Sequence, residues 1–346
     1  MTPLIASRRD LARGLAFLAA GVAAPAGLAG PACAASDSRV DAAVKAAYEQ
    51  FRNLAEGKNA DYIPVLAKVP SNYFGIAVAT PDGQMSTAGD IQPTFSIQSI
   101  SKVFTLALVF QESGEPLVEN SIGVDATGQV FNSIVAVEQY KGKEINPLVN
   151  PGAIATTGMV KGASENEVWG KILGIHSAFA GRELSVDDEV YRSEAATNQR
   201  NRAIGMLMSA YERFPGDPAQ AVDLYTKQCA IAVTAKDLGV MAATLANGGK
   251  NPITHKQVID NRFVPGILAV MATAGLYDDS GKWLFHTGLP AKSGVGGGII
   301  AVSPGKFGAG TFAPPLDAAG NSVRGQRAIA AISDALGGNP YAVTPA

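Results

Sequence analysis

A serine and a lysine three residues apart are the sharpest chemical feature of the sequence. They are Ser99 and Lys102, in the run FSIQSISK over residues 95–102. If this run begins a helix, the two side chains share a face, and the positive end of the helix dipole favours an oxyanion near the serine. A lysine whose pKa is lowered by burial can accept the hydroxyl proton. The spacing therefore predicts a serine nucleophile with a lysine as general base.

Such a short pattern also arises by chance, and it occurs a second time at Ser303 and Lys306. That copy spans a Pro-Gly turn between two expected strands, so its serine has no helix start and we expect no chemistry there. The Lys292-Ser293-Gly294 triplet supports the first copy, because Lys-Thr/Ser-Gly accompanies Ser-x-x-Lys in penicillin-recognising enzymes. A backbone N–H from this stretch and that of Ser99 would suit an oxyanion hole.

Other kinds of site find little support in the sequence. The glycines at 294–298 precede a strand-like run rather than a helix, which argues against a dinucleotide loop. The three histidines lie in no hydrolase or HExxH pattern, and two cysteines are too few for a zinc cluster. The net charge of −2 gives no basic excess for nucleic acid or a membrane surface. Hydrophobic residues make up 47% of the chain, enough for a substantial core.

The first 34 residues are typical of an export signal rather than of a folded segment. Ser7-Arg8-Arg9-Asp10-Leu11 resembles a twin-arginine signal, and a small, apolar run follows over 14–30. Ala32-Cys33-Ala34 offers a cleavage site, so we expect a periplasmic protein with a single catalytic domain over 35–346. A membrane anchor fits less well because the run contains Pro25 and many glycines, and a lipid on Cys33 is a minor alternative.

The serine and lysine must be positioned by the elements around them. We expect a helix from a cap at Asp37 to Gly57, strands over 73–80 and 84–88, and a helix over 99–113. A long helical segment over 193–214 and helices capped by Asp217 and by Thr234 with Asp237 follow. Strands over 298–302 and 307–312 and a helix over 322–336 complete the set. This order predicts an α/β (α+β) fold, with an antiparallel sheet split in sequence, helices on its faces and a helical insertion.

Longer runs of the sequence resemble the serine-dependent glutaminases of bacteria and animal mitochondria. The similar runs cover nearly all of residues 60–325: ADYIP at 60–64, FSIQSISK at 95–102, NPLVN at 146–150, SE at 193–194, NRAIG at 201–205, VMAATLANGG at 240–249, GLYD at 275–278, GLPAKSGV at 288–295, PPLD at 314–317 and GNSV at 320–323. The resemblance implies a β-lactamase/penicillin-binding-protein-like fold and hydrolysis of L-glutamine to glutamate and ammonia. It also implies no metal, no organic cofactor and a homo-oligomer, a dimer or tetramer.

The resemblance further implies which residues form the site. Ser99 is the expected nucleophile and Lys102 its base. The positions that would contact glutamine are Tyr62, Gln98, Ser99, Asn150, Glu194, Asn201, Tyr225, Tyr277 and Val295. We favour Tyr277 as the acid that protonates departing ammonia and Tyr225 for binding and support.

The chemistry of these side chains suits glutamine. A carboxylate such as Glu194 suits the α-ammonium group, and asparagine and tyrosine donors suit the α-carboxylate. Glu194 and Asn201 are seven residues apart, which predicts one face of one helix. Pro151 departs from the alanine usual in the family, and we expect it to restrain a loop and to affect the Asn150 amide.

Two other functions remain open from sequence. The first is a β-lactamase or peptidase with the same fold, although the chain lacks the expected Ser-Asp-Asn triplet. The second is a non-catalytic periplasmic amino-acid-binding protein, which would not need Lys102 beside Ser99. An exported structural protein would leave the polar set unexplained.

Overall fold

A five-stranded antiparallel sheet forms the centre of one half of the molecule. The computed structural model describes residues 32–343, with side chains from residue 38 onward. The strands are β1 (Gly75–Ala79), β2 (Met85–Gly89), β6 (Ala291–Gly294), β7 (Gly298–Ser303) and β8 (Phe307–Phe312), in the order β2-β1-β8-β7-β6. The first two strands in the chain therefore join the last three in one sheet through the pairing of β1 with β8, as the predicted split antiparallel sheet requires.

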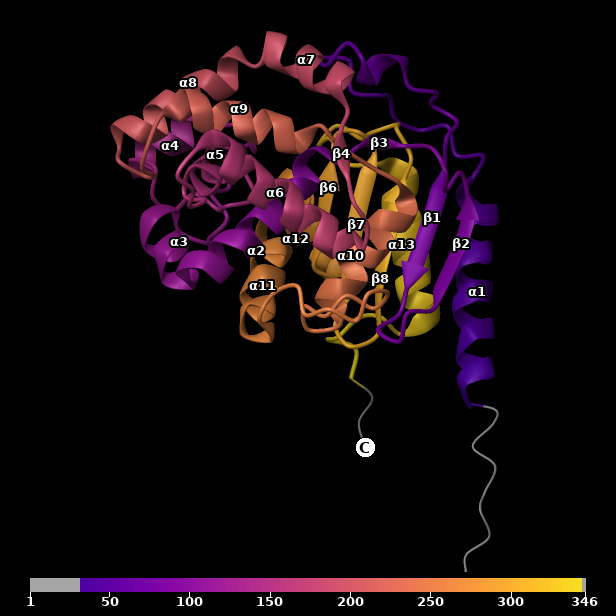
Figure 1. Ribbon diagram of the computed structural model, residues 1–346. Helices are drawn as coiled ribbons and strands as arrows, with labels where there is room; N and C mark the ends of the chain where they lie inside the picture. The colour runs from indigo at the N-terminus through magenta and orange to yellow at the C-terminus, as the bar shows by residue number, and fades with distance from the viewer. Residues whose placement is uncertain (1–31, 344–346) are drawn as a thin grey trace, which may run out of the picture.

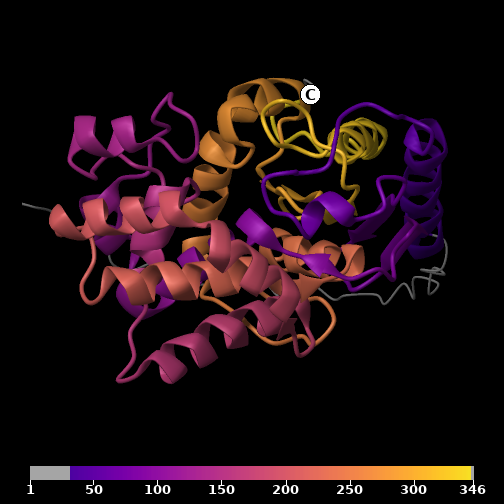
Figure 2. The same ribbon diagram turned by 90° about the horizontal axis from the view of Figure 1, so that it is seen from above.

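Both faces of this sheet are covered by helices (Figures 1 and 2). Side chains alternate along β7: Ile299 packs with α1 (Ala32–Phe51) and α13 (Val323–Leu336), whereas Ile300 packs with α10 (Ala235–Ala246). A Cβ on Gly310 of β8 would lie 2.4 Å from the backbone nitrogen of Gly239 in α10, so glycine lets this helix approach closely. Burial on both faces explains why β1, β7 and β8 contain few polar residues.

A helical block lies beside the sheet (Figure 1). Its helices are α2 (Ser101–Ser113), α3 (Glu115–Ile122), α4 (Ile134–Tyr140), α5 (Asn150–Gly158), α6 (Glu165–Ala180), α7 (Asp188–Thr197), α8 (Gln199–Ala210) and α9 (Pro218–Cys229). The helices α11 (Val264–Ala274) and α12 (Ser280–Thr287) lead back to the sheet. A small sheet that the sequence did not predict joins β3 (Phe95–Ser96), β5 (Ile231–Val233) and β4 (Ser185–Val186).

Short 3-10 turns complete the fold. They are η1 (Leu66–Lys68), η2 (Gln98–Ile100), η3 (Asn261–Phe263) and η4 (Tyr277–Asp279). The second of them holds Ser99, and the fourth begins at Tyr277. Three of the predicted site residues, Gln98, Ser99 and Tyr277, thus lie in tight turns rather than inside regular helices.

Two predicted caps, at Asp217 and at Thr234 with Asp237, are confirmed, and Ser322 provides a third that was not predicted. The Asp217 side chain accepts a hydrogen bond from the backbone N–H of Ala219 at the start of α9. Thr234 and Asp237 form a reciprocal capping box on α10. Ser322 accepts from the Gly325 N–H at the start of α13. These local signals set helix starts because each one satisfies backbone donors that the first turn leaves unpaired.

The predicted bounds of the first helix were wrong. The helix α1 begins at Ala32, before Asp37, and ends at Phe51 rather than Gly57. Gly57 has φ +88°, and a Cβ there would lie 2.5 Å from the carbonyl oxygen of Leu316. Its role is therefore a close backbone approach beside the Lys58–Leu316 bridge, not a helix stop. The expected export signal lies mostly outside the described residues.

The long helical segment over 193–214 is two helices, α7 and α8, which meet at Asn198. The Asn198 side chain donates to Thr226 Oγ1 of α9 at 3.0 Å. The backbone of Asn198, at φ −93° and ψ 27°, departs from a regular helix and redirects the chain. The helix predicted over 99–113 likewise starts later, at Ser101, because η2 precedes it.

Candidate active site

Ser99 lies in the turn η2, between β3 and the buried helix α2. The preceding residue, Gln98, has φ +51°, a conformation that is uncommon outside glycine. A Cβ on Gly294 would lie 2.7 Å from the carbonyl oxygen of Ile97, so the end of β6 packs directly against this turn. Glycine in the Lys292-Ser293-Gly294 triplet thus permits the close approach of β6 to the serine.

Lys102 is fully buried one turn beyond Ser99. Its Nζ donates to Asn150 Oδ1 at 2.6 Å and to the carbonyl oxygen of Leu148 at 3.4 Å. Burial lowers the pKa of this lysine to about 8. A substantial neutral fraction near physiological pH is what a general base needs.

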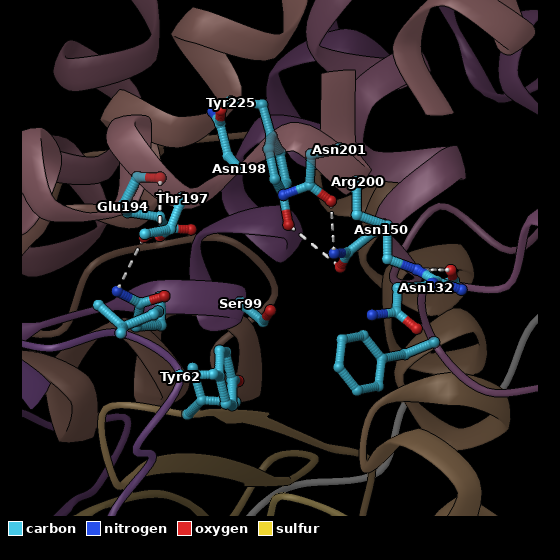
Figure 3. Close-up of a pocket in the computed structure, with 14 residues that line it drawn as sticks. Tyr62, Ser99, Asn132, Asn150, Glu194, Thr197, Asn198, Arg200, Asn201 and Tyr225 are labelled. Atoms are coloured by element: carbon cyan, nitrogen blue, oxygen red, sulfur yellow. Dashed lines mark hydrogen bonds between the residues drawn. The ribbon is translucent and has the colours of Figure 1, made fainter. Parts of the chain in front are cut away.

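Ser99 faces a cavity of about 300 Å³. Figure 3 shows the serine between Glu194 on one side and Asn150 on the other. The lining residues come from at least five separate elements: Tyr62, Ile63, Gln98, Ser99, Phe131, Asn132, Asn150, Glu194, Thr197, Asn198, Arg200, Asn201, Tyr225 and Val295. Eight of the nine predicted substrate contacts are among them, and Tyr277 is not.

Glu194 forms the acidic side of this cavity. The Nε2 of Gln98 donates to its Oε2 at 3.3 Å, and burial raises the pKa of the Glu194 carboxyl to about 7. Glu194 lies on α7 and Asn201 on α8, so the prediction that they share one helix face was wrong. The bend at Asn198 nevertheless leaves both side chains on the same cavity.

The opposite side is a connected set of amides and hydroxyls (Figure 3). Asn150 Nδ2 donates to Asn201 Oδ1 at 3.0 Å, and Tyr225 Oη donates to Asn150 Oδ1 at 3.1 Å. Asn150 therefore links Lys102 to the cavity wall. It is the first residue of α5, and Pro151 occupies the first helical turn, where a missing N–H is tolerated. The expectation that Pro151 restrains a loop was wrong, because a helix begins there.

Tyr277 reaches the serine from outside the cavity lining. Its hydroxyl donates to the Ser293 carbonyl oxygen at 3.4 Å and interacts with the Ser99 side chain, and burial raises its pKa to about 12. The Tyr277 ring packs at 4.7 Å between centroids against Phe131 and lines a neighbouring cavity of about 440 Å³. Tyr277 thus contacts the predicted nucleophile, but its ring lines a different cavity from the one that Ser99 lines.

Several lining residues were not predicted from sequence. Phe131 and Asn132 come from the loop before α4, and Thr197 and Arg200 flank the α7–α8 bend. Arg200 Nε donates to the Asn132 carbonyl oxygen at 3.0 Å, which joins the two groups. Arg200 directly precedes Asn201, a predicted site residue, so its place in the sequence could have identified it. The loop residues carry no periodicity or motif that would have revealed them.

The remaining sequence features have structural explanations within residues 32–343. Ser303 is buried and donates to the Gly338 carbonyl oxygen at 2.7 Å, which supports the view that the second Ser-x-x-Lys copy has no chemistry. In that described part, no group of three or more His, Cys, Asp or Glu side chains is placed to hold a metal ion. Nor does that part contain a helix with the length and apolar character needed to cross a bilayer.

Comparison with known proteins matches the chain to one family over most of its length. The family model described as Glutaminase matches residues 57–341. A glutaminase of Colwellia psychrerythraea is 53% identical over 295 residues, which cover 85% of this chain and 95% of that protein.

Two solved structures are similar in fold. A probable glutaminase, YbaS, has a TM-score of 0.87 at 46% identity and covers 88% of this chain and 99% of its own. A probable glutaminase from Bacillus subtilis, complexed with 6-diazo-5-oxo-L-norleucine, has a TM-score of 0.78 at 31% identity, with 88% and 97% covered. The predicted fold class is confirmed by these similarities.

Proposed function

This chain belongs to the glutaminase family, which hydrolyses glutamine to glutamate and ammonia, and we propose that it does so through an acyl-enzyme on Ser99. The observation that carries the proposal is the position of Ser99. It faces the cavity, directly follows the left-handed residue Gln98, and lies beside a buried lysine and a tyrosine hydroxyl. Membership of this family decides against the β-lactamase and amino-acid-binding alternatives.

In the first half of the reaction, neutral Lys102 takes the proton of Ser99 as Oγ bonds to the side-chain amide carbon. The oxyanion is stabilised by backbone N–H groups near Ser99 and Val295. Tyr277 gives its proton to the leaving nitrogen, the C–N bond breaks, and ammonia departs. The protonated Lys102 then returns a proton to Tyr277, which leaves a γ-glutamyl ester on Ser99.

In the second half, water attacks the ester carbon and loses a proton to Lys102. The Ser99 oxygen leaves with a proton from Lys102, and glutamate is released. One water is consumed and one ammonia formed for each glutamine. Lys102 serves as base in both halves, because burial holds its pKa near the pH of the reaction.

Substrate recognition divides between the two sides of the cavity. Glu194 binds the α-ammonium group, whose positive charge favours the ionised carboxylate. Asn150, Asn201 and Tyr225 offer amide and hydroxyl groups to the α-carboxylate, and the exposed Tyr62 also lines the cavity. A relative in complex with an L-amino-acid derivative, 6-diazo-5-oxo-L-norleucine, supports an amino-acid ligand for this chain.

Ammonia release from L-glutamine tests the proposal, with L-asparagine in parallel. Ser99→Ala should lower kcat by roughly 10⁴-fold or more. Ser303→Ala is the matched control, because it removes the serine of the second Ser-x-x-Lys copy, and it should retain wild-type activity. Release that persists in Ser99→Ala would refute the nucleophile. No release by folded wild-type protein would refute the activity.

The two tyrosines are separated by phenylalanine substitution. Tyr277→Phe should lower kcat by roughly 10²- to 10⁴-fold, the usual contribution of a general acid. Tyr225→Phe should act more on KM, because its hydroxyl is directed at Asn150 on the binding side. The opposite pattern would exchange the two roles.

We also propose that the protein is exported to the periplasm by the twin-arginine route and assembles into a homo-oligomer. The paired arginines at 8 and 9 and the apolar run after them support export. Exposed Val135 on α4 and Met206 on the neighbouring α8 support self-association. Retention of an Arg8→Lys/Arg9→Lys variant in the cytoplasm tests the first proposal. The molar mass by light scattering tests the second, and a monomer at all concentrations would refute it.

A further inference from the structure

Lys292, the first residue of the Lys-Ser-Gly triplet, is a second fully buried lysine near the site. Its Nζ donates to the carbonyl oxygens of Gly275 at 3.0 Å and Ser293 at 2.7 Å. It lines neither the Ser99 cavity nor the adjoining one that Tyr277 lines. Both of these hydrogen bonds go to backbone carbonyls, so Lys292 makes no hydrogen bond to the side chains proposed to bind substrate.

The nearest aromatic side chain to this amine is Tyr277. Lys292 Nζ lies 4.3 Å from the centroid of the Tyr277 ring. The Ser293 carbonyl oxygen that accepts from Lys292 also accepts from the Tyr277 hydroxyl. Lys292 therefore contacts Tyr277 at its ring and, through one shared acceptor, at its reactive end.

Tyr277 needs such support, because its backbone has φ +52°. A bulky residue in the left-handed region is strained and persists only where its surroundings hold it. Lys292 ties Gly275, two residues before the tyrosine, to β6. A Cβ on Gly275 would lie 1.7 Å from the Ala291 carbonyl oxygen, so this segment is pressed against the strand that carries Lys292.

Ser293 and Asn321 also hold the segment before Tyr277 against β6. Ser293 Oγ donates to Asn321 Oδ1 at 2.6 Å, and Asn321 Nδ2 donates to the Leu276 carbonyl oxygen at 3.3 Å. Burial, with a smaller contribution from Lys102, lowers the pKa of Lys292 well below its usual value. An uncharged amine can stay buried with two carbonyl acceptors without a counter-ion.

We propose that Lys292 is a positioning residue for glutamine hydrolysis, which holds Tyr277 so that its hydroxyl stays beside the Ser99 side chain. The proposal rests on the role of Tyr277 in the proposed mechanism. Lys292 acts on the reaction through the Gly275 and Ser293 carbonyls and through the face of the tyrosine ring. It touches neither substrate nor the bond that breaks.

The test is a cycle of Lys292→Met, Tyr277→Phe and the double variant, assayed by steady-state ammonia release. Lys292→Met keeps the length of the side chain and removes its donors. It should lower kcat roughly 100-fold, the usual effect of a misplacement of about 1 Å, with KM within about threefold. The double variant should be no slower than Tyr277→Phe alone, because residues that act as a unit are not additive. Lys306→Met is the control and should retain wild-type kcat.

Each outcome decides the matter. Lys292→Met with wild-type kcat, or losses that multiply in the double variant, would overturn the proposal. A loss confined to KM would also overturn it, since that would indicate a binding role. If Lys292→Met does not fold, Lys292→Leu also removes the donors and carries the same comparison. Tyr277→Phe with full activity would instead refute the acid role of Tyr277, and the Lys292 proposal with it. Failure of Ser99→Ala to lose activity would refute the acyl-enzyme alone.

Discussion

Glu194→Gln should stabilise this protein at alkaline pH while it damages substrate binding. Glu194 is buried, and burial raises the pKa of its carboxyl from 4.5 to about 7. The folded state therefore binds the proton more tightly than the unfolded state. The stability that this carboxyl contributes is fully present below pH 4.5 and is lost as the pH rises through 7.

The magnitude follows from the two pKa values. One pKa unit corresponds to about 1.4 kcal/mol, so the ionised carboxylate forgoes about 3 kcal/mol of unfolding free energy above pH 8. Glutamine has nearly the same shape, keeps an oxygen for the Gln98 amide and cannot ionise. The variant should thus exceed wild type by about 3 kcal/mol at pH 8.5 and match it near pH 4.5. Its KM for glutamine should rise roughly 100-fold, because the substrate ammonium loses its charged partner.

The assay is urea unfolding of both proteins across this pH range. Because other titrating groups are common to the two proteins, the difference between their unfolding free energies isolates Glu194. A difference that does not change with pH would refute the reasoning, since Glu194 would then ionise at its ordinary pKa. Glu194→Asp, which keeps the charge, should show no gain at pH 8.5.

Three further expectations concern the site and its supports. kcat/KM for glutamine should rise from pH 6 to 9, because Lys102 and Glu194, with pKa values of about 8 and 7, must both lose protons to act; a flat or falling profile would contradict these roles. Pro151→Ala should lower the free energy of unfolding in urea by roughly 0.4–1 kcal/mol, since Pro151 suits the first turn of α5. It should change kcat by less than about threefold, and a tenfold loss of kcat would show that Pro151 positions the Asn150 amide. Thr234→Ala should cost about 1 kcal/mol by the same measurement through loss of the α10 capping box, and an unchanged midpoint would count against that contribution.

Much of the site could be predicted from sequence because its strongest signals are local. Ser99 and Lys102 are three residues apart, and the caps at Asp217 and Thr234 involve neighbours in the chain. The strands over 298–302 and 307–312 were likewise predicted from short runs on either side of a Pro-Gly turn. The resemblance to glutaminases supplied the distant members of the set, such as Asn150 and Tyr225. No local pattern singles those out, because isolated asparagines and tyrosines are common in any chain.

Errors arose where contacts between distant segments override local periodicity. The sequence predicts one helix over residues 193–214, yet the chain bends at Asn198. The Asn198 side chain donates a hydrogen bond to Thr226 on α9 at this bend. The same holds around Tyr277. Its left-handed backbone, its packing on Phe131 and its interaction with the Ser99 side chain depend on segments far apart in the chain.

By itself, the sequence determined the nucleophile motif, four of the five strands of the large sheet, two helix caps and the family. The tertiary structure decided which side chains share the cavity, that Lys292 lies under Tyr277, and that Lys102 and Glu194 have displaced pKa values. The physical reason is that spacing and periodicity act over a few residues of chain. Burial, by contrast, is created only when distant segments pack together and remove water from the groups between them.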